Sequence, residues 1–302
     1  LEFTSHGYDG YVFDENENRI DFKGYRADAI NNFALEYLDS IDKNQPFFMF
    51  VSQLEPHHQN DRKCFEGYRE TVGRYKDYPI PEDLAAFKGD YYSAYPDYLS
   101  AINRIDYNLG LLIEKLKKKG IYEDTVIIYT SDHGCHYKTR NAEYKRSCHD
   151  SSIHVPLVIR GGAFKGGYVD DRMVSLIDLP ATILAAADID IPDYYRGYYL
   201  SDNDEERDCI FLQISESQCG RAIRTKQYKY SVAAPTCAAG MTMSSSPVYM
   251  EEYLYDLQND PNELRNLIKD QRYKLVRKKM REMLLDEMKK AGEKDAIITP
   301  AM

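Results

Sequence analysis

The chain has 302 residues and a formal net charge of −10, with 39 lysine and arginine residues against 49 aspartate and glutamate residues. Hydrophobic residues make up 43% of the sequence and are spread along it, which is typical of a globular protein and not of a disordered one. The acidic balance argues against a nucleic-acid partner, because binding to nucleic acid depends on clustered lysine and arginine. No apolar run approaches the ~20 residues that a membrane span requires, so we expect no membrane association.

The six cysteines are scattered and form no Cys-x-x-Cys pair. Their spacing indicates neither a disulfide scaffold nor a structural zinc site. Residues 1–5 resemble neither a signal peptide nor a natural start, so the sequence leaves the localisation open.

Hydrophobic periodicity predicts an α/β pattern in the first two thirds of the chain. Amphipathic helices are predicted at residues 26–41, 98–119 and 175–187. Continuous apolar runs, typical of strands buried on both faces, occupy residues 47–51, 125–130 and 156–159. Residues 59–95 are polar and rich in tyrosine and proline, which predicts a long excursion from the core. We therefore expect a mostly parallel sheet flanked by helices.

The pattern changes after an acidic stretch at residues 201–208, which is typical of a solvated linker. Beyond it, the sequence predicts antiparallel strands at residues 210–214, 222–232 and 248–257, followed by an amphipathic helix at 272–290. We expect two domains, an α/β domain over residues 1–200 and a smaller α+β domain over 201–302.

The sequence Ser-Asp-His-Gly at residues 131–134 follows directly after a predicted buried strand. Ligands of open α/β sheets bind outside the carboxyl ends of the strands. A carboxylate and an imidazole, Asp132 and His133, would offer two ligands to a divalent cation. By itself the dipeptide favours a structural role, in which Asp132 caps a turn.

Two further segments place imidazole or basic groups near strand ends. His57, in Glu55-Pro56-His57-His58, follows the apolar run at 47–51 and is placed to contact an anion or donate a proton. Residues 143–156 lead into the third predicted strand and carry Lys145, Arg146 and His149, which would supply positive charge near an anion. Each segment alone is equally compatible with a hydrated loop.

The order of these segments resembles the sulfatase family of the alkaline-phosphatase-like superfamily. That family has Pro-His after one strand, Ser-Asp-His-Gly or Ser-Asp-Asn-Gly after the next, then a lysine, then Ser-Ile-Arg-Val-Pro. Here the last motif reads Ser-Ile-His-Val-Pro at residues 152–156. The resemblance runs from residue 26 to 267, and it includes residues 175–182, 221–225, 228–230, 253–257 and 260–263.

The resemblance implies an alkaline-phosphatase-like fold, sulfuric ester hydrolysis and a divalent metal, usually calcium. The polar, tyrosine-rich loops favour a sulfated sugar as the substrate. By position, the resemblance implies metal ligation by Asp132 and His133, catalysis by His57 and Lys145, and substrate contact by His149 and Arg221.

One part of the family pattern is missing. The formylglycine nucleophile arises within Cys/Ser-x-Pro/Ala-x-Arg, and no cysteine or serine of this chain introduces that motif. The aspartate pair that supplies further metal ligands is also missing, since Asp170-Asp171 does not follow a buried strand and is interpreted as a solvated turn. We therefore expect the chain to be the C-terminal two thirds of a sulfatase, inactive alone. An exposed sheet edge would then favour self-association.

Two other functions stay open at this point. A phosphate or phosphonate ester hydrolase of the same superfamily would share the Asp-His pair, although Lys145 and the Ser-Ile-x-Val-Pro context favour a sulfatase. A non-catalytic module that binds sulfated glycans is the second alternative.

Overall fold

The computed structural model describes residues 6–59, 62–201, 206–236 and 239–301. The chain forms two compact units, one made of residues 1–80 and 90–125 and the other of residues 81–89 and 126–302. Residues on both sides of position 200 belong to the second unit. The division into domains at that position stays a prediction, and most of the predicted acidic linker, residues 202–205, lies outside the described residues.

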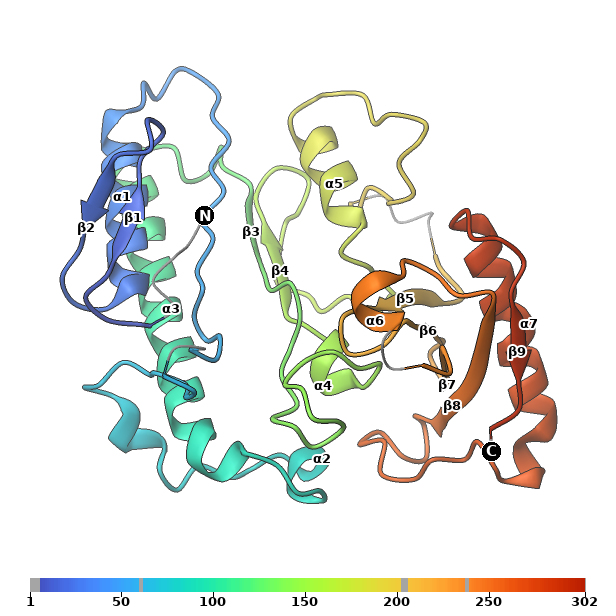
Figure 1. Cartoon of the computed structure of the whole chain (residues 1–302). Helices are drawn as coiled ribbons and strands as arrows, with labels where there is room; N and C mark the ends of the chain where they lie inside the picture. The colour runs from blue at the N-terminus through green and yellow to red at the C-terminus, as the bar shows by residue number, and fades with distance from the viewer. Residues whose placement is uncertain (1–5, 60–61, 202–205, 237–238, 302) are drawn as a thin grey trace. The chain divides into compact units, whose positions relative to one another are not determined.

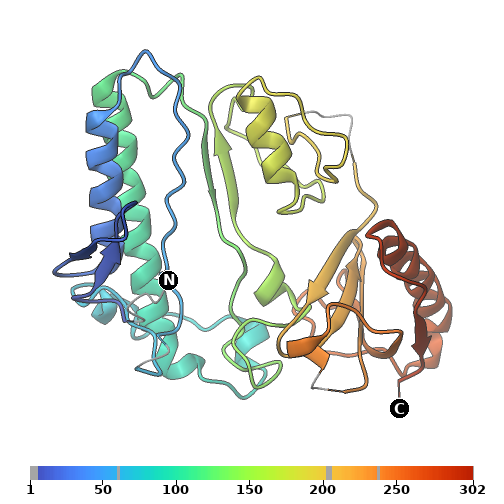
Figure 2. The same cartoon turned by 45° about the horizontal axis from the view of Figure 1, so that its top comes forward.

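The first unit is built on two helices, α1 (Arg26–Ser40) and α3 (Tyr91–Lys119), which lie side by side (Figures 1 and 2). Arg104 of α3 donates hydrogen bonds of 2.6 and 2.9 Å to the carboxylate of Asp28 on α1 and so joins the two. The unit also contains the antiparallel pair β1 (Tyr11–Phe13) and β2 (Arg19–Asp21) and the 3-10 helix η1 (Val72–Tyr75).

Both predicted helices of this unit are confirmed. Helix α3 begins seven residues before the predicted start at residue 98 and contains Pro96 within its first turns. It ends at Gly120, whose φ of 77° lies in the left-handed region that favours glycine.

The predicted strand at residues 47–51 is not formed. The segment has no regular secondary structure and pairs with no strand among the described residues, and the side chains of Phe48 and Phe50 are 67% and 81% exposed. An apolar run forms a buried strand only where neighbouring strands cover it, and none of the described residues supplies that cover.

The second unit begins with the short helix α2 (Glu82–Ala85) and contains the pair β3 (Ile127–Thr130) and β4 (Leu157–Arg160). These strands pair antiparallel, with Ile127 opposite Arg160, so the expected parallel arrangement of these two strands is wrong. The reason is that the link between them turns back on itself and carries only the short helix α4 (Asp150–Ile153) in place of a crossover. Helix α5 (Asp178–Ala186) lies within the predicted range 175–187.

A five-stranded sheet dominates the rest of the second unit (Figure 1). Its order is β5-β6-β7-β8-β9, antiparallel except for the parallel pair β8–β9. The strands are β5 (Ile210–Ile214), β6 (Gly220–Arg224), β7 (Tyr228–Ala233), β8 (Val248–Asp256) and β9 (Ile297–Thr299). The strand predicted at 222–232 is in fact two strands, because Thr225 and Tyr228 close a turn through mutual hydrogen bonds of 2.8 Å.

Helix α7 (Lys274–Lys290) packs on this sheet as predicted, preceded by the 3-10 helix η2 (Gln271–Tyr273). The short helix α6 (Ala239–Thr242) lies between β7 and β8 in the chain. The apolar core between helix and sheet includes Ile223, Tyr230, Leu254, Met280, Leu284 and Met288. Among the residues that the structure describes, no helix is both long and apolar enough to span a bilayer.

Candidate functional site

Asp132 and His133 lie together in the turn that follows β3. The Asp132 carboxylate, 80% exposed, accepts a hydrogen bond of 2.9 Å from the backbone N–H of His133. His133 Nε2 lies 3.1 Å from the other carboxylate oxygen, and Nδ1 lies 2.9 Å from the carbonyl oxygen of Gly134. The turn therefore presents a carboxylate and an imidazole side by side at the surface.

The turn is pressed closely against α4. The backbone N–H of Gly134 donates a 2.7 Å hydrogen bond to the carbonyl oxygen of Ser152. A Cβ atom at position 134 would lie 2.2 Å from the carbonyl oxygen of Ser151, which is far too close for two atoms not bonded to each other. Glycine is required here because any larger residue would push the Asp132–His133 turn away from α4.

The backbone around Lys145 is held from several directions. The carbonyl oxygen of Tyr144 accepts a 2.7 Å hydrogen bond from the N–H of His136, and that of Arg146 accepts bonds from Asn141 and Ser217 at 2.8 and 3.1 Å. Such contacts fix the path of a loop that has no regular secondary structure of its own.

The charge of Lys145 affects the pKa of Cys135, which lies two residues after His133. Burial raises the pKa of the Cys135 thiol to about 12, and the Lys145 ammonium opposes that rise. Cys135 directly follows Gly134. Three predicted site residues, Asp132, His133 and Lys145, thus belong to one local assembly in the second unit.

His57 belongs to the first unit, where a buried ion pair holds its loop. Glu55 is 4% exposed and lies 2.9 Å from the guanidinium of Arg26. Arg26 also donates to the side chain of Gln59, whose amide donates a 3.1 Å hydrogen bond to the carbonyl oxygen of His57. Burial raises the pKa of Glu55 although Arg26 opposes the rise. Arg26 and Glu55 were not predicted as supporting residues; the carboxylate beside Pro-His-His was the available signal.

His149 is interior. The residue is only 1% exposed. Its Nδ1 lies 3.1 Å from the Ser147 hydroxyl and its Nε2 lies 3.0 Å from the Tyr255 hydroxyl. Burial, followed by the nearby Arg140 and Lys229 charges, lowers the pKa of His149 to about 2, so the ring is neutral at pH 7. Contact between His149 and a substrate stays a prediction; the structure shows a ring whose two nitrogens both have protein partners.

Arg221 is also interior, at 2% exposure. It pairs with Glu293 and donates to the carbonyl oxygens of Gly220 and Ser244 at 2.7 and 2.5 Å. These contacts give Arg221 a structural role between β6 and the segment that follows α7, and its contact with a substrate stays a prediction.

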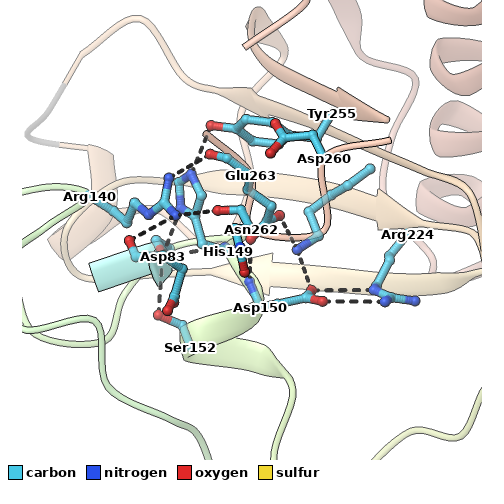
Figure 3. Close-up of polar contacts among 12 residues, drawn as sticks. Asp83, Arg140, His149, Asp150, Ser152, Arg224, Tyr255, Asp260, Asn262 and Glu263 are labelled. Atoms are coloured by element: carbon cyan, nitrogen blue, oxygen red, sulfur yellow. Dashed lines mark hydrogen bonds and ion pairs between the residues drawn. The ribbon is translucent and has the colours of Figure 1, made fainter. Parts of the chain in front are cut away.

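Asp150, the first residue of α4, and three charged residues around it form what we call the Lys229 cluster: Lys229, Asp150, Glu263 and Arg224 (Figure 3 labels Asp150, Glu263 and Arg224). Lys229 bonds to both carboxylates, at 2.5 Å to Asp150, and Arg224 lies 3.3 Å from Asp150. The sequence pattern marked residues 228–230 and 260–263 as family matches but gave no reason to expect that they meet. This cluster is the main feature near the site that the sequence did not predict.

The described residues do not complete a metal site. Calcium takes six to eight oxygen ligands, whereas Asp132 and His133 offer one carboxylate and one imidazole. Within residues 6–59, 62–201, 206–236 and 239–301, no three His, Cys, Asp or Glu side chains gather in a position to hold a metal ion. Further ligands would have to come from elsewhere.

Comparison with known proteins extends over both units. The sulfatase family model matches residues 3–189, and the model for the C-terminal part of N-sulphoglucosamine sulphohydrolase matches residues 142–290. An arylsulfatase of Clostridium perfringens is 28% identical over 85% of this chain and 56% of its own length. The uncharacterized sulfatase YidJ of Escherichia coli is 30% identical over 92% of this chain and 58% of its own length.

Among solved structures, one determined in complex with its substrate D-glucosamine-2-N,6-O-disulfate superposes with a TM-score of 0.75. It is 20% identical, and the match covers 96% of this chain and 74% of that one. The chain spans little more than half the length of the two curated sulfatases described above. The predicted alkaline-phosphatase-like fold class is confirmed, and the chain belongs to the sulfatase family.

Proposed function

We propose that this chain forms the larger part of a sulfuric ester hydrolase whose formylglycine nucleophile is supplied by residues that precede it. One observation carries the proposal: in a chain of the sulfatase family, the Asp132–His133 turn and the Lys145 loop are bound to the same short helix, α4. A sulfated sugar is the proposed substrate class. Support for it comes from the structural neighbour solved with a disulfated glucosamine.

The chemistry explains why these side-chain types would serve. Cleavage of a sulfate ester builds negative charge on the leaving oxygen and on the sulfuryl oxygens. The Lys145 ammonium would stabilise charge on a sulfuryl oxygen, and the His57 imidazole would donate a hydrogen bond or a proton to the departing alcohol. Asp132 and His133 would be two of the ligands of a divalent cation, for which we propose calcium, and that cation would neutralise further charge.

Self-association of the chain is part of the proposal. Phe48 and Phe50 are exposed on a segment that pairs with no described strand, and Val158 on β4 is 61% exposed. Exposed apolar side chains beside unpaired backbone favour association between copies. We expect the chain alone to sediment partly as dimers or larger species, and Phe48→Ser with Phe50→Ser to shift it toward the monomer.

Activity of a longer protein tests the main proposal. The protein encoded by the complete reading frame that contains this chain would be produced together with a formylglycine-generating enzyme and assayed on an aryl sulfate, an aryl phosphonate monoester and a sulfated glucosamine. We expect hydrolysis of the sulfates by the longer protein and none by the 302-residue chain. Faster cleavage of the phosphonate would contradict the proposal. Sugar binding by the chain without hydrolysis by the longer protein would favour a binding module.

A further inference from the structure

Within the Lys229 cluster, the other three residues contact both the side chain and the backbone of Asp150, the first residue of α4. Lys229, on β7, is 0% exposed and bonds through Nζ to Asp150 at 2.5 Å and to Glu263. The second carboxylate oxygen of Glu263 accepts a 2.7 Å hydrogen bond from the backbone N–H of Asp150. Arg224, on β6, lies 3.3 Å from each oxygen of the Asp150 carboxylate. Both the side chain and the backbone of Asp150 are therefore held by the five-stranded sheet and the loop that follows β8.

The charges of the cluster balance, with two cations and two carboxylates. Burial opposes ionisation of Asp150, but Lys229 and Arg224 outweigh it and lower the pKa of that carboxyl. For Glu263, burial outweighs the opposing effect of the Lys229 ammonium, and the pKa of this carboxyl is raised. We assign the firm negative charge to Asp150 because it contacts two cations. A buried ion pair is weak evidence for stability by itself, since apolar residues of similar volume often serve as well. What a charged cluster adds is a fixed geometry.

A second set of contacts connects this loop to the candidate site. Arg140 donates hydrogen bonds to the carbonyl oxygens of Asn262 and Glu263 at 2.9 and 2.7 Å (Figure 3). Arg140 lies between the Asp132–His133 turn and Lys145 in the sequence. The segment that carries the candidate residues is thus bound at Asp150 and again at Arg140.

Helix α4 connects the Lys229 cluster to the candidate site through contacts of Ser152. The carbonyl oxygen of Ser152 accepts the hydrogen bond from Gly134, beside the Asp132–His133 turn. The Ser152 hydroxyl lies 3.1 Å from that of Ser147, two residues after Lys145. A shift of α4 would therefore move the Asp132–His133 turn and the Lys145 loop together.

We infer that Lys229, Asp150 and Glu263 are positioning residues, which hold α4 so that Lys145 stands where a sulfate oxygen is bound. Lys229 and Glu263 do not touch the substrate, since they are buried at 0% and 2% exposure. The inference rests on the proposed function for the role of Lys145. The fixing of α4 by the cluster is a separate property that can be measured without any activity.

Lys229→Met tests the inference, because it removes the charge and keeps much of the length of the side chain. In the 302-residue chain, we expect amide hydrogen exchange in residues 144–153 to become at least about tenfold faster, with β5 and α7 unchanged. In the longer protein, we expect kcat to fall about 10- to 100-fold with KM within about twofold, since a displacement near 1 Å has effects of that size. Glu263→Gln keeps the shape of the side chain but replaces one of its two acceptor oxygens with an NH2 donor, and it should show the same pattern more weakly.

Lys226→Met is the matched control. Lys226 lies in the turn of the same hairpin, and its side chain is 58% exposed in a pair with Glu206, so neither exchange nor kcat should change. Unchanged exchange at residues 144–153 in both Lys229→Met and Glu263→Gln would overturn the inference. So would a uniform rise across the second unit, which would show a role in stability only. An inactive wild-type longer protein would refute the proposed function, while the exchange result would still decide whether the cluster fixes α4.

Discussion

Replacing Lys145 with alanine in the longer protein is expected to lower kcat/KM for a sulfate ester about 100-fold or more. The expectation follows from the charge that develops on the sulfuryl oxygens, because loss of one aligned electrostatic contact commonly has an effect of that size. The measurement is the steady-state hydrolysis of an aryl sulfate, with the melting temperature recorded for each variant. Lys145 is half-buried in a surface loop, so the variant should fold.

Two further variants make the Lys145 result specific. Lys145→Arg keeps the charge but changes its shape, and we expect it to recover part of the activity. Lys165→Ala removes an exposed lysine from another turn of the same unit and should leave kcat/KM unchanged. Near-normal turnover by Lys145→Ala would refute the catalytic role of this residue.

Replacing Arg221 with methionine is expected to lower the free energy of unfolding by about 3–5 kcal/mol. The substitution would leave Glu293, 9% exposed, without its cation, and the loss of one partner of a buried pair commonly has an effect of this size. The carbonyl oxygens of Gly220 and Ser244 would lose their donor as well. Urea unfolding of the 302-residue chain, followed by tyrosine fluorescence, measures the change.

Arg272→Met is the control for Arg221. Arg272 is 71% exposed in its pair with Asp270, so its replacement should change the unfolding free energy by no more than about 1 kcal/mol. The structural role of Arg221 predicts an unchanged KM in the longer protein wherever Arg221→Met stays folded. A stable variant with a raised KM would instead assign Arg221 to substrate contact, as the family resemblance implied.

Local sequence signals predicted the elements that depend on local physics. Helix α1 follows from its apolar periodicity, and α3 ends at residue 119, where the predicted helix ends. Strand β5 occupies the predicted residues 210–214. The apolar run at 47–51 gave a wrong prediction of a buried strand. Whether a strand is buried depends on its neighbouring strands, and the residues of the run carry no information about them. Strand β9 is three residues long, too short for a periodic signal.

The candidate site was predicted by residue type but not by geometry. The Asp132–His133 pair was found from its place after a strand, and Lys145 from the resemblance. Contacts over long stretches of chain, such as Lys229 with Asp150 and Glu263, leave no local pattern, because each residue alone is an ordinary surface type. Burial, likewise, is a tertiary property of a residue and cannot be read from the motif in which it occurs.

A crystal structure of the longer protein with inorganic sulfate and calcium would show directly whether Lys145 binds sulfate beside a cation held by Asp132 and His133. We expect a sulfate ion contacted by Lys145 Nζ, beside a cation ligated by Asp132 and His133. Sulfate bound away from Lys145, or a cation site that excludes Asp132, would refute the proposed roles of these residues.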